Sequence, residues 1–426
     1  MGQTALDFNG DLINLKGDFD IFVAGLDNCG NKIFFANAGN NNAGNDINQI
    51  VADNKYVYIT GTLLGTGIYD FNNTLQPLKG AGDILVAGLN QCNGKQKFFK
   101  TAGGIDLDIG NSLTVNDNGI FITGKLGSGA SDFNSTAVSL YGVGDIFVAG
   151  LDKCGNQIFF KNAGGGNNII EPSFGTNITS DCENIFVTGE IAGITATDFN
   201  GNEINQTNGS IFVSGLDPLG NQLFFKTAGS NISTSKSILT NDHGVFITGE
   251  TQFVYNDFTG KSFTKSSITN ANNGLAYVSG LTKCGKQKFF VTAGTTGSSE
   301  GINITSDDNG IYVTGYIYGP DATDFSGNPI SNLQGIEDIF VAKLDFCGRQ
   351  QFFLTAGSSD NDFGNQIVVR NNEIYVTGVM GGVTGINFKH CPVTTLKDNG
   401  DVFVARLDDL CGHKRSTRST MPYIPR

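Results

Sequence analysis

One six-residue segment recurs along the chain and constrains its fold more than any other feature. The segment Ile21-Phe22-Val23-Ala24-Gly25-Leu26 returns as Ile146-Phe147-Val148-Ala149-Gly150-Leu151 and in further variants. The position of Ala24 is filled again, at spacings of 62 to 65 residues, by Ala87, Ala149, Ser214, Ser279, Ala342 and Ala405. A period this steady predicts one supersecondary unit copied along the chain.

Each unit contains four short apolar runs separated by turn residues, the pattern of strands and hairpins. Around residue 300 the runs are 301–305, 311–315, 339–344 and 351–357, and Asn309-Gly310 is suited to a tight hairpin turn. No run has helical periodicity. Four antiparallel strands per unit, repeated radially, predict a single all-β propeller of four-stranded blades.

These residues resemble a known family. Ile311-Tyr312-Val313-Thr314-Gly315, then Asp338-Ile339-Phe340-Val341-Ala342-Lys343-Leu344-Asp345, then a strand ending in Ala356-Gly357, is similar to the SBBP-type β-propeller repeat. The resemblance extends from about Asp7 to Gly412, with Ala-Gly where the family usually has Gly-Gly. It implies a propeller scaffold and no particular reaction.

The repeat count predicts six complete units and a partial one, hence six or seven blades. The second strand of a unit ends in Thr-Gly only at Gly61, Gly124, Gly189, Gly249, Gly315 and Gly378, whereas the third strand occurs seven times. We expect residues 1–412 to form the propeller, with the hairpin at 20–38 closing the ring beside a weak last strand. Residues 413–426 form a basic tail.

Composition excludes some partners. Lys and Arg total 27 against 40 Asp and Glu, a net charge of −13, which disfavours nucleic acids and anionic membranes. No apolar run approaches the length that spans a bilayer, and the N-terminus lacks a signal-peptide pattern, so we expect no membrane insertion. The compartment stays open, although unpaired cysteines favour cytoplasmic synthesis or a virion. The tail concentrates Lys414, Arg415 and Arg418, which suits an acidic partner or a neighbouring copy.

A recurring Asp-Phe pair lies in the connection between the second and third strands. The aspartate either caps its own turn or belongs to a ring of carboxylates that binds a cation, a sugar or a basic partner. Repetition in every blade favours the turn, and the candidate partner-binding aspartates are Asp70, Asp132, Asp198, Asp257 and Asp324. Asp106-Leu107-Asp108 and Asp360-Asn361-Asp362 hint at calcium, but neither completes a calcium loop. We expect no other cofactor.

The chain has 8 cysteines, and most of them recur in the turn before the fourth strand, on the opposite face. No zinc-type or Cys-x-x-Cys spacing occurs, and blades fan apart too far there for intrachain disulfides. Free thiols suit a reducing compartment. The alternative is interchain contact through Cys29, Cys92, Cys154, Cys284, Cys347 and Cys411.

Three functions remain open from the sequence. The first is a non-enzymatic structural or interaction propeller in a larger assembly, such as a virion or surface layer, with other proteins or its own copies as partners. The second is a carbohydrate-binding adhesin that uses the Asp-Phe face, with Tyr69, Tyr141 or Tyr318 against the sugar. The third is a hydrolase or lyase with its site at the central channel, although only three histidines occur, at unrelated positions.

Overall fold

The computed structural model describes residues 4–41, 44–165, 172–193, 195–205, 210–230, 232–265, 274–294, 297–319, 321–394, 396 and 400–408. Within these ranges every regular element is a β-strand, so the predicted all-β class is confirmed. The described part of the chain contains no helix with the length and apolarity needed to cross a membrane.

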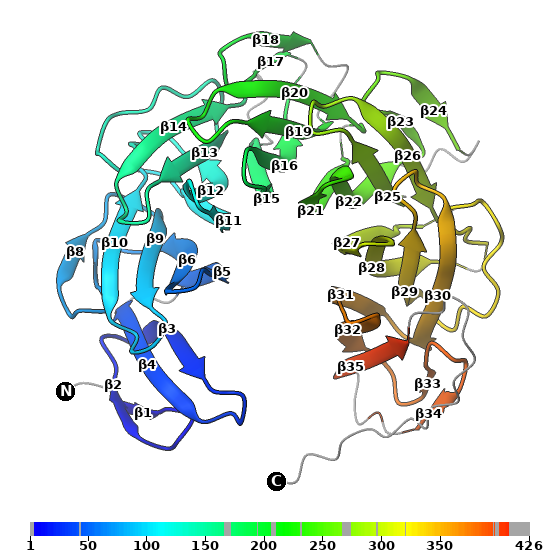
Figure 1. Ribbon diagram of the computed structural model, residues 1–426, viewed down its shortest axis with the longest axis horizontal. Helices are drawn as coiled ribbons and strands as arrows, with labels where there is room; N and C mark the ends of the chain where they lie inside the picture. Colours follow the sequence, from blue (N-terminus) through cyan, green and yellow to red (C-terminus); the bar gives the residue numbers. More distant parts are fainter. Residues whose placement is uncertain are drawn as a thin grey trace.

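Five blades have the four antiparallel strands that the repeat predicts (Figure 1). Blade 1 consists of β5 (Asp46–Ala52), β6 (Tyr56–Leu63), β9 (Asp83–Asn90) and β10 (Gln96–Ala102). Blade 2 consists of β11 (Ile109–Asn116), β12 (Gly119–Leu126), β13 (Asp145–Leu151) and β14 (Gln157–Ala163). Blade 3 consists of β15 (Phe174–Ser180), β16 (Ile185–Ile191), β19 (Ser210–Leu216) and β20 (Gln222–Ala228). Blade 4 consists of β21 (Thr234–Asn241), β22 (Gly244–Gln252), β25 (Gly274–Leu281) and β26 (Gln287–Ala293). Blade 5 consists of β27 (Glu300–Asp307), β28 (Gly310–Tyr318), β29 (Glu337–Leu344) and β30 (Gln350–Ser358).

The two ends of the propeller are incomplete among the described residues. The first end, which we call the half-blade, has only the third-type and fourth-type strands, β3 (Phe19–Leu26) and β4 (Lys32–Asn40). The last blade has three strands, β31 (Asp362–Arg370), β32 (Glu373–Met380) and β35 (Asp401–Asp408). The position of its fourth strand falls at residues 409–426, outside the described part of the chain. Five blades are therefore complete among the described residues.

The connection between the second and third strands forms a small outer hairpin that the sequence did not reveal. We call this hairpin the clasp of its blade. The clasps are β1 (Thr4–Leu6) with β2 (Leu12–Asn14), β7 (Gly67–Tyr69) with β8 (Leu75–Pro77), β17 (Thr195–Thr197) with β18 (Glu203–Asn205), β23 (Val254–Asn256) with β24 (Ser262–Thr264), and β33 (Gly385–Ile386) with β34 (Pro392–Val393). Blades 2 and 5 have single bridges in the same connection.

Except for the clasp of β1 and β2, the clasps contact the fourth strand of the preceding blade. Tyr69 of β7 pairs with Gly39 of β4, and β33 pairs with the end of β30. In blades 2, 3 and 4 a single β-bridge joins the connection to the end of the preceding blade's fourth strand. These bridges pair Gly103 with Ser131, Gly164 with Thr197, and Gly229 with Asn256. The clasps therefore join each blade to its neighbour at the outer rim.

The core is divided among the junctions between neighbouring blades. At the junction of blades 1 and 2, Ile84 and Val86 of β9 pack with Phe147 and Ala149 of β13, all fully buried. Alternate residues of one third strand face opposite neighbours, as pleating requires. Equivalent clusters occupy the other junctions, so each of blades 1 to 5 is stabilised by both neighbours.

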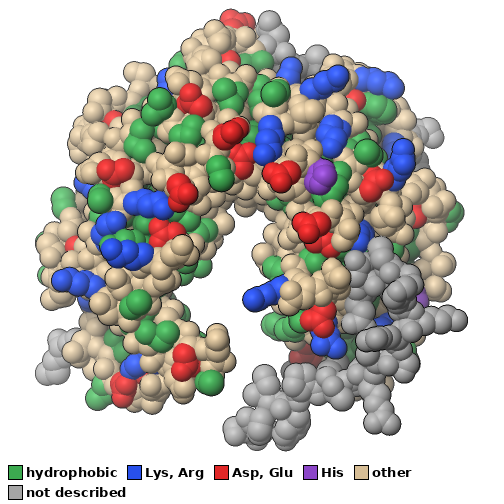
Figure 2. All heavy atoms as spheres, in the orientation of Figure 1, with side chains coloured by type: hydrophobic (Ala, Val, Ile, Leu, Met, Phe, Trp, Pro, Cys, Tyr) green, Lys and Arg blue, Asp and Glu red, His purple; other side chains and the backbone are tan. Residues whose placement is uncertain are grey.

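The described blades form an open arc, and closure of the ring by the N-terminal hairpin stays a prediction. Figure 1 shows the half-blade and the last blade at opposite ends of the arc, and Figure 2 shows the opening between them. Among the described residues no β-ladder joins β3 or β4 to β35; β3 and β4 continue into β7 and β8 instead. Each junction is a packed core with little freedom to bend.

Candidate interaction surfaces

The recurring aspartates lie inside the turns of the clasps. Asp198 Oδ1 accepts hydrogen bonds from the backbone N–H groups of Asn200 (2.9 Å) and Asn202 (2.8 Å). Its Oδ2 accepts from Nε2 of Gln222 (2.8 Å), whose Oε1 accepts from the N–H of Phe199 (2.9 Å). The clasp is thereby tied to the first residue of its own fourth strand.

This arrangement repeats in the other blades, where a glutamine binds the Asp-Phe turn. The Asp–Gln pairs are Asp70–Gln96, Asp132–Gln157, Asp257–Gln287 and Asp324–Gln350. The five aspartates are only 2% to 8% exposed. Burial alone would raise the pKa of Asp198, but its hydrogen bonds outweigh burial and hold that pKa below its usual value. These carboxylates are engaged in turn capping, which supports the structural interpretation and leaves little of them for a partner to contact.

The half-blade has a different turn. Lys32 replaces the glutamine and forms ion pairs with Asp7 and Asp11. Its clasp, β1 with β2, forms a separate two-stranded sheet, because the described residues provide no preceding blade for it to join. Phe8, beside Asp7, is more than half exposed, whereas the equivalent Phe199 is buried.

The predicted thiol face agrees in part with the described structure. Cys29, Cys92, Cys154, Cys284 and Cys347 are free and exposed in the turns before the fourth strands, as are Cys182 and Cys391 elsewhere. Cys411, Lys414, Arg415 and Arg418 lie outside the described residues. Apart from the turn at Cys29, the described turns before the fourth strands also contact the preceding blade: the ideal Cβ position at Gly155 lies 2.6 Å from the ring of Phe98, so glycine is required there.

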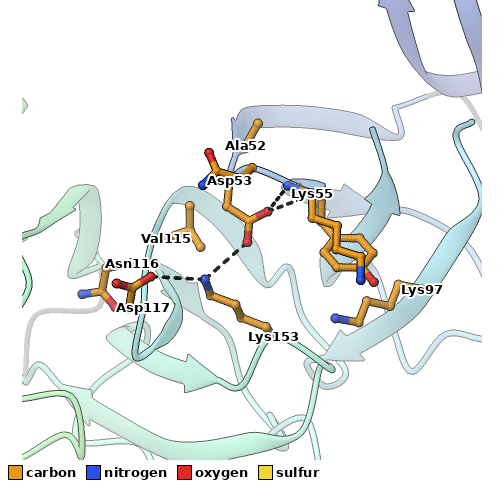
Figure 3. Close-up of a pocket in the computed structure, with 10 residues that line it drawn as sticks. Ala52, Asp53, Lys55, Lys97, Val115, Asn116, Asp117 and Lys153 are labelled. Atoms are coloured by element: carbon orange, nitrogen blue, oxygen red, sulfur yellow. Dashed lines mark hydrogen bonds and ion pairs between the residues drawn. The ribbon is translucent and has the colours of Figure 1, made fainter. Parts of the chain in front are cut away.

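A hollow of about 470 Å³ opens on this face between blades 1 and 2 (Figure 3). Lys153 Nζ lies 3.4 Å from Asp53 Oδ2 and 3.8 Å from Asp117 Oδ1, and it crosses from one blade to the other. Lys97 Nζ lies 4.0 Å from the ring centroid of Tyr56. The cations are paired with carboxylates or an aromatic ring, so the hollow has the character of an interblade ion-pair network. Lys283 and Asp181 form the corresponding pair at 2.8 Å between blades 3 and 4.

The two sequences that hinted at calcium contain buried carboxylates bound by the backbone. Asp108 accepts hydrogen bonds from the N–H groups of Gly104 and Gly127, each at 2.7 Å. Asp362 accepts from Ser358 (2.6 Å) and Gly381 (2.7 Å). Burial raises the pKa of Asp108 to about 7 and that of Asp362 to about 6. Within the described ranges, no three His, Cys, Asp or Glu side chains converge as metal ligands.

A central hollow of about 300 Å³ is lined by the first strands of blades 1 to 5 and of the last blade. Its lining is neutral, made of amides, hydroxyls and aliphatic side chains. Gln49 Oε1 accepts hydrogen bonds from Ser112 Oγ (2.5 Å) and the N–H of Leu113 (2.9 Å), and Asn303 Oδ1 accepts from the N–H of Ile367 (3.2 Å). These amides connect the inner strands of neighbouring blades.

The two ends of the arc expose residues whose equivalents are buried at the junctions among blades 1 to 5. Phe22 of β3 is 53% exposed, whereas its equivalents Phe147, Phe212 and Phe340 are fully buried. At the other end, Val402 and Val404 are 82% and 73% exposed, whereas the equivalent Ile146 and Val148 are fully buried. The sequence pattern is the same at both kinds of position, so these end faces could not be recognised from the sequence alone.

Comparisons with known proteins do not assign a family. No protein-family model matches the chain, and no curated protein matches it. Similar solved structures include the quinohemoprotein alcohol dehydrogenase of Comamonas testosteroni, with TM-score 0.35, 9% identity, and coverage of 88% of this chain and 76% of that one. They also include BamB of Moraxella catarrhalis, with TM-score 0.30, 9% identity and coverage of 77% and 92%. A third is rhamnogalacturonan lyase YesW, with TM-score 0.33, 12% identity and coverage of 84% and 73%. The repeated four-stranded blades make the chain a β-propeller, and the SBBP resemblance stays a prediction.

Proposed function

We propose that this protein is a non-enzymatic structural propeller that works as a component of a larger assembly. The observation that carries the proposal is the exposure of Phe22, Val402 and Val404 at the ends of the arc. Large apolar side chains gathered on an exposed face are typical of protein interaction sites. Among the described residues no strand pairs with the outer edge of β35, and an unpaired strand edge is suited to pairing with another chain.

The uniform interior supports the same proposal. The clasp aspartates cap turns, the central hollow has a neutral lining, and the buried carboxylates accept backbone hydrogen bonds. A catalytic site needs ionisable groups with distinct roles in one cavity. These side chains therefore serve contacts within and between the blades, which suits a structural role.

The adhesin and the enzyme gain no specific support. Tyr69, Tyr141 and Tyr318 belong to three different blades, 1, 2 and 5. The hollow at the centre of the inner strands contains no side chain that could act as a general acid or base.

Sedimentation velocity of the full-length protein, with and without reductant, tests the proposed function. We expect species heavier than the 45.1 kDa of one chain. Oligomers that disappear with reductant would assign the contact to the exposed thiols. Oligomers that disappear when Lys414, Arg415 and Arg418 are all replaced by glutamine would assign it to the basic tail. The proposal would be contradicted if the protein had the mass of one chain at every concentration and bound no other protein.

A further inference from the structure

We propose that the two end faces bind each other between copies of this chain, so that the protein assembles head to tail. This inference rests on the proposed function and names the partner as a second copy. The starting face consists of Phe8, Phe22, Leu26 and Phe35 of the half-blade. The finishing face consists of Tyr375, Val402 and Val404 of the last blade.

The two faces are the two halves of a contact that the chain already makes with itself. At the junction of blades 2 and 3, Phe121, Ile146 and Val148 of one blade pack with Phe199 and Phe212 of the next. Tyr375, Val402 and Val404 occupy the positions of Phe121, Ile146 and Val148 in the last blade. Phe8 and Phe22 occupy the positions of Phe199 and Phe212 in the half-blade. Each end therefore presents one side of an established interface without the other.

The aromatic geometry of the starting face is preorganised for this contact. Phe22 and Phe35 stack with ring centroids 5.1 Å apart and an interplanar angle of 10°, and Phe8 lies 6.2 Å from Phe22. In blade 3, the equivalent Phe212 and Phe225 stack at 5.1 Å and 9°, with Phe199 at 6.4 Å. The same cluster is thus formed in both places, and only in blade 3 is it covered by a neighbour. A preformed cluster loses little conformational entropy on binding.

Two further contacts of the half-blade lack a neighbour in this structure. The clasp of β1 and β2 has the form of the clasps that bind a preceding blade, but it is isolated. Gly30 has no atom within 4 Å of its ideal Cβ position, whereas the equivalent Gly155 and Gly220 approach aromatic rings of the preceding blade. Together with the exposed phenylalanines, these features indicate that a blade-like surface belongs in front of the half-blade.

A second copy is favoured over closure within one chain because the arc is held open by its packed junctions. Joining the two ends within a chain would require displacement across several cores that resist deformation. A contact between different patches of two copies is heterologous and produces a filament or a closed ring of chains. Its apolar character makes it independent of reductant.

The test uses full-length variants that each disable one face. Phe22→Glu disables the starting face, and Val402→Glu with Val404→Glu disables the finishing face. Leu219→Glu, at another exposed apolar position on blade 3, is the matched control, and circular dichroism verifies that every variant is folded. We expect concentration-dependent oligomers for the parent chain and for L219E, and single chains for each face variant alone.

Mixing the two face variants distinguishes head-to-tail pairing from other contacts. Each variant retains one working face, so an equimolar mixture is expected to form dimers of twice 45.1 kDa and nothing larger. Failure of the mixture to dimerise would overturn the heterologous pairing. Oligomers that persist in both variants would overturn the end-face contact while leaving the proposed function standing. A parent chain that remains single at all concentrations would overturn the self-assembly inference, and the proposed function would then depend on a different partner.

Discussion

The half-blade and blade 3 present the same aromatic cluster in two different environments. Phe22 and Phe212 occupy equivalent places in their strands, each stacks on an equivalent phenylalanine at 5.1 Å, and they lie 6.2 and 6.4 Å from the clasp phenylalanine. Phe212 is fully buried, whereas Phe22 is 53% exposed. The difference shows that the cluster is formed within a blade, whereas its burial depends on the preceding blade. The stability of each blade is therefore partly supplied by its neighbours.

The largest change in stability should come from removing one aromatic ring, which we compare between blade 3 and the half-blade. Phe212→Ala leaves a cavity in a closed junction and should reduce the free energy of unfolding by about 3 to 5 kcal/mol. Phe22→Ala removes a ring that is about half exposed to solvent. It should therefore reduce the free energy of unfolding by clearly less. Urea unfolding followed by circular dichroism measures both. Equal losses would mean that the half-blade is covered in solution.

The buried carboxylates should make the protein more stable in mild acid. Burial, together with the charge of the nearby Asp362, raises the pKa of Asp338 to about 7. The folded state therefore holds a proton at pH 5 to 6 that the unfolded chain has released, and stability falls as pH rises from about 4 to 7. The free energy of unfolding should be roughly 2 to 4 kcal/mol higher at pH 5 than at pH 7.5.

Asp338→Asn is the matched test of this pH dependence. The substitution should raise stability at pH 7.5 and flatten the pH profile, because the neutral amide can still accept the bond from the N–H of Gln334. Asp20→Asn at the equivalent position of the half-blade is the control, because Asp20 is partly exposed there. An unchanged profile in D338N would show that Asp338 does not carry the effect.

Disrupting the turn of a clasp should have an intermediate effect on stability. Asp198→Ala leaves the N–H groups of Asn200 and Asn202 and the amide of Gln222 without their acceptor, at a cost of about 1 to 3 kcal/mol. Asp7→Ala changes the exposed turn of the half-blade and should shift the melting temperature less. Calorimetry compares the two variants. A stable D198A variant that had lost binding to a glycan or protein would instead favour the partner-binding interpretation.

The smallest change in stability should come from breaking the partly exposed ion pairs. Lys283 lies 2.8 Å from Asp181 across a blade junction, and Lys283→Met should cost roughly 0.2 to 1 kcal/mol at low salt. Arg406 and Glu373 form a more exposed pair at 3.4 Å on the last blade, so Arg406→Met should cost less. Thermal unfolding at low and high salt tests both, and salt should remove most of the difference.

The sequence predicts much of this fold because the repeat is explicit. Strands β27 to β30 lie where the alternation at 301–305, 311–315, 339–344 and 351–357 places them. The clasps escape prediction because strands of two or three residues, such as Gly67–Tyr69, are too short to show alternation. The partner of each turn aspartate, such as Gln222 for Asp198, is separated from it by the whole third strand.

The open arc escapes prediction for a different reason. Its shape depends on the angle at each junction, which is set by packing between side chains such as Ile146 and Phe212 and not by the pattern of one blade. Phe22 and Phe212 therefore have the same local sequence signal, although one lies at an end and the other inside. The end faces become visible only when burial is compared between blades.

The mixing of the two face variants tests the central claim most directly. Sedimentation velocity should show single chains for Phe22→Glu alone and for Val402→Glu with Val404→Glu alone, and dimers limited to two chains in their mixture. That result would establish that the starting face of one copy binds the finishing face of another. Single chains in the mixture, or oligomers in either variant alone, would contradict the account.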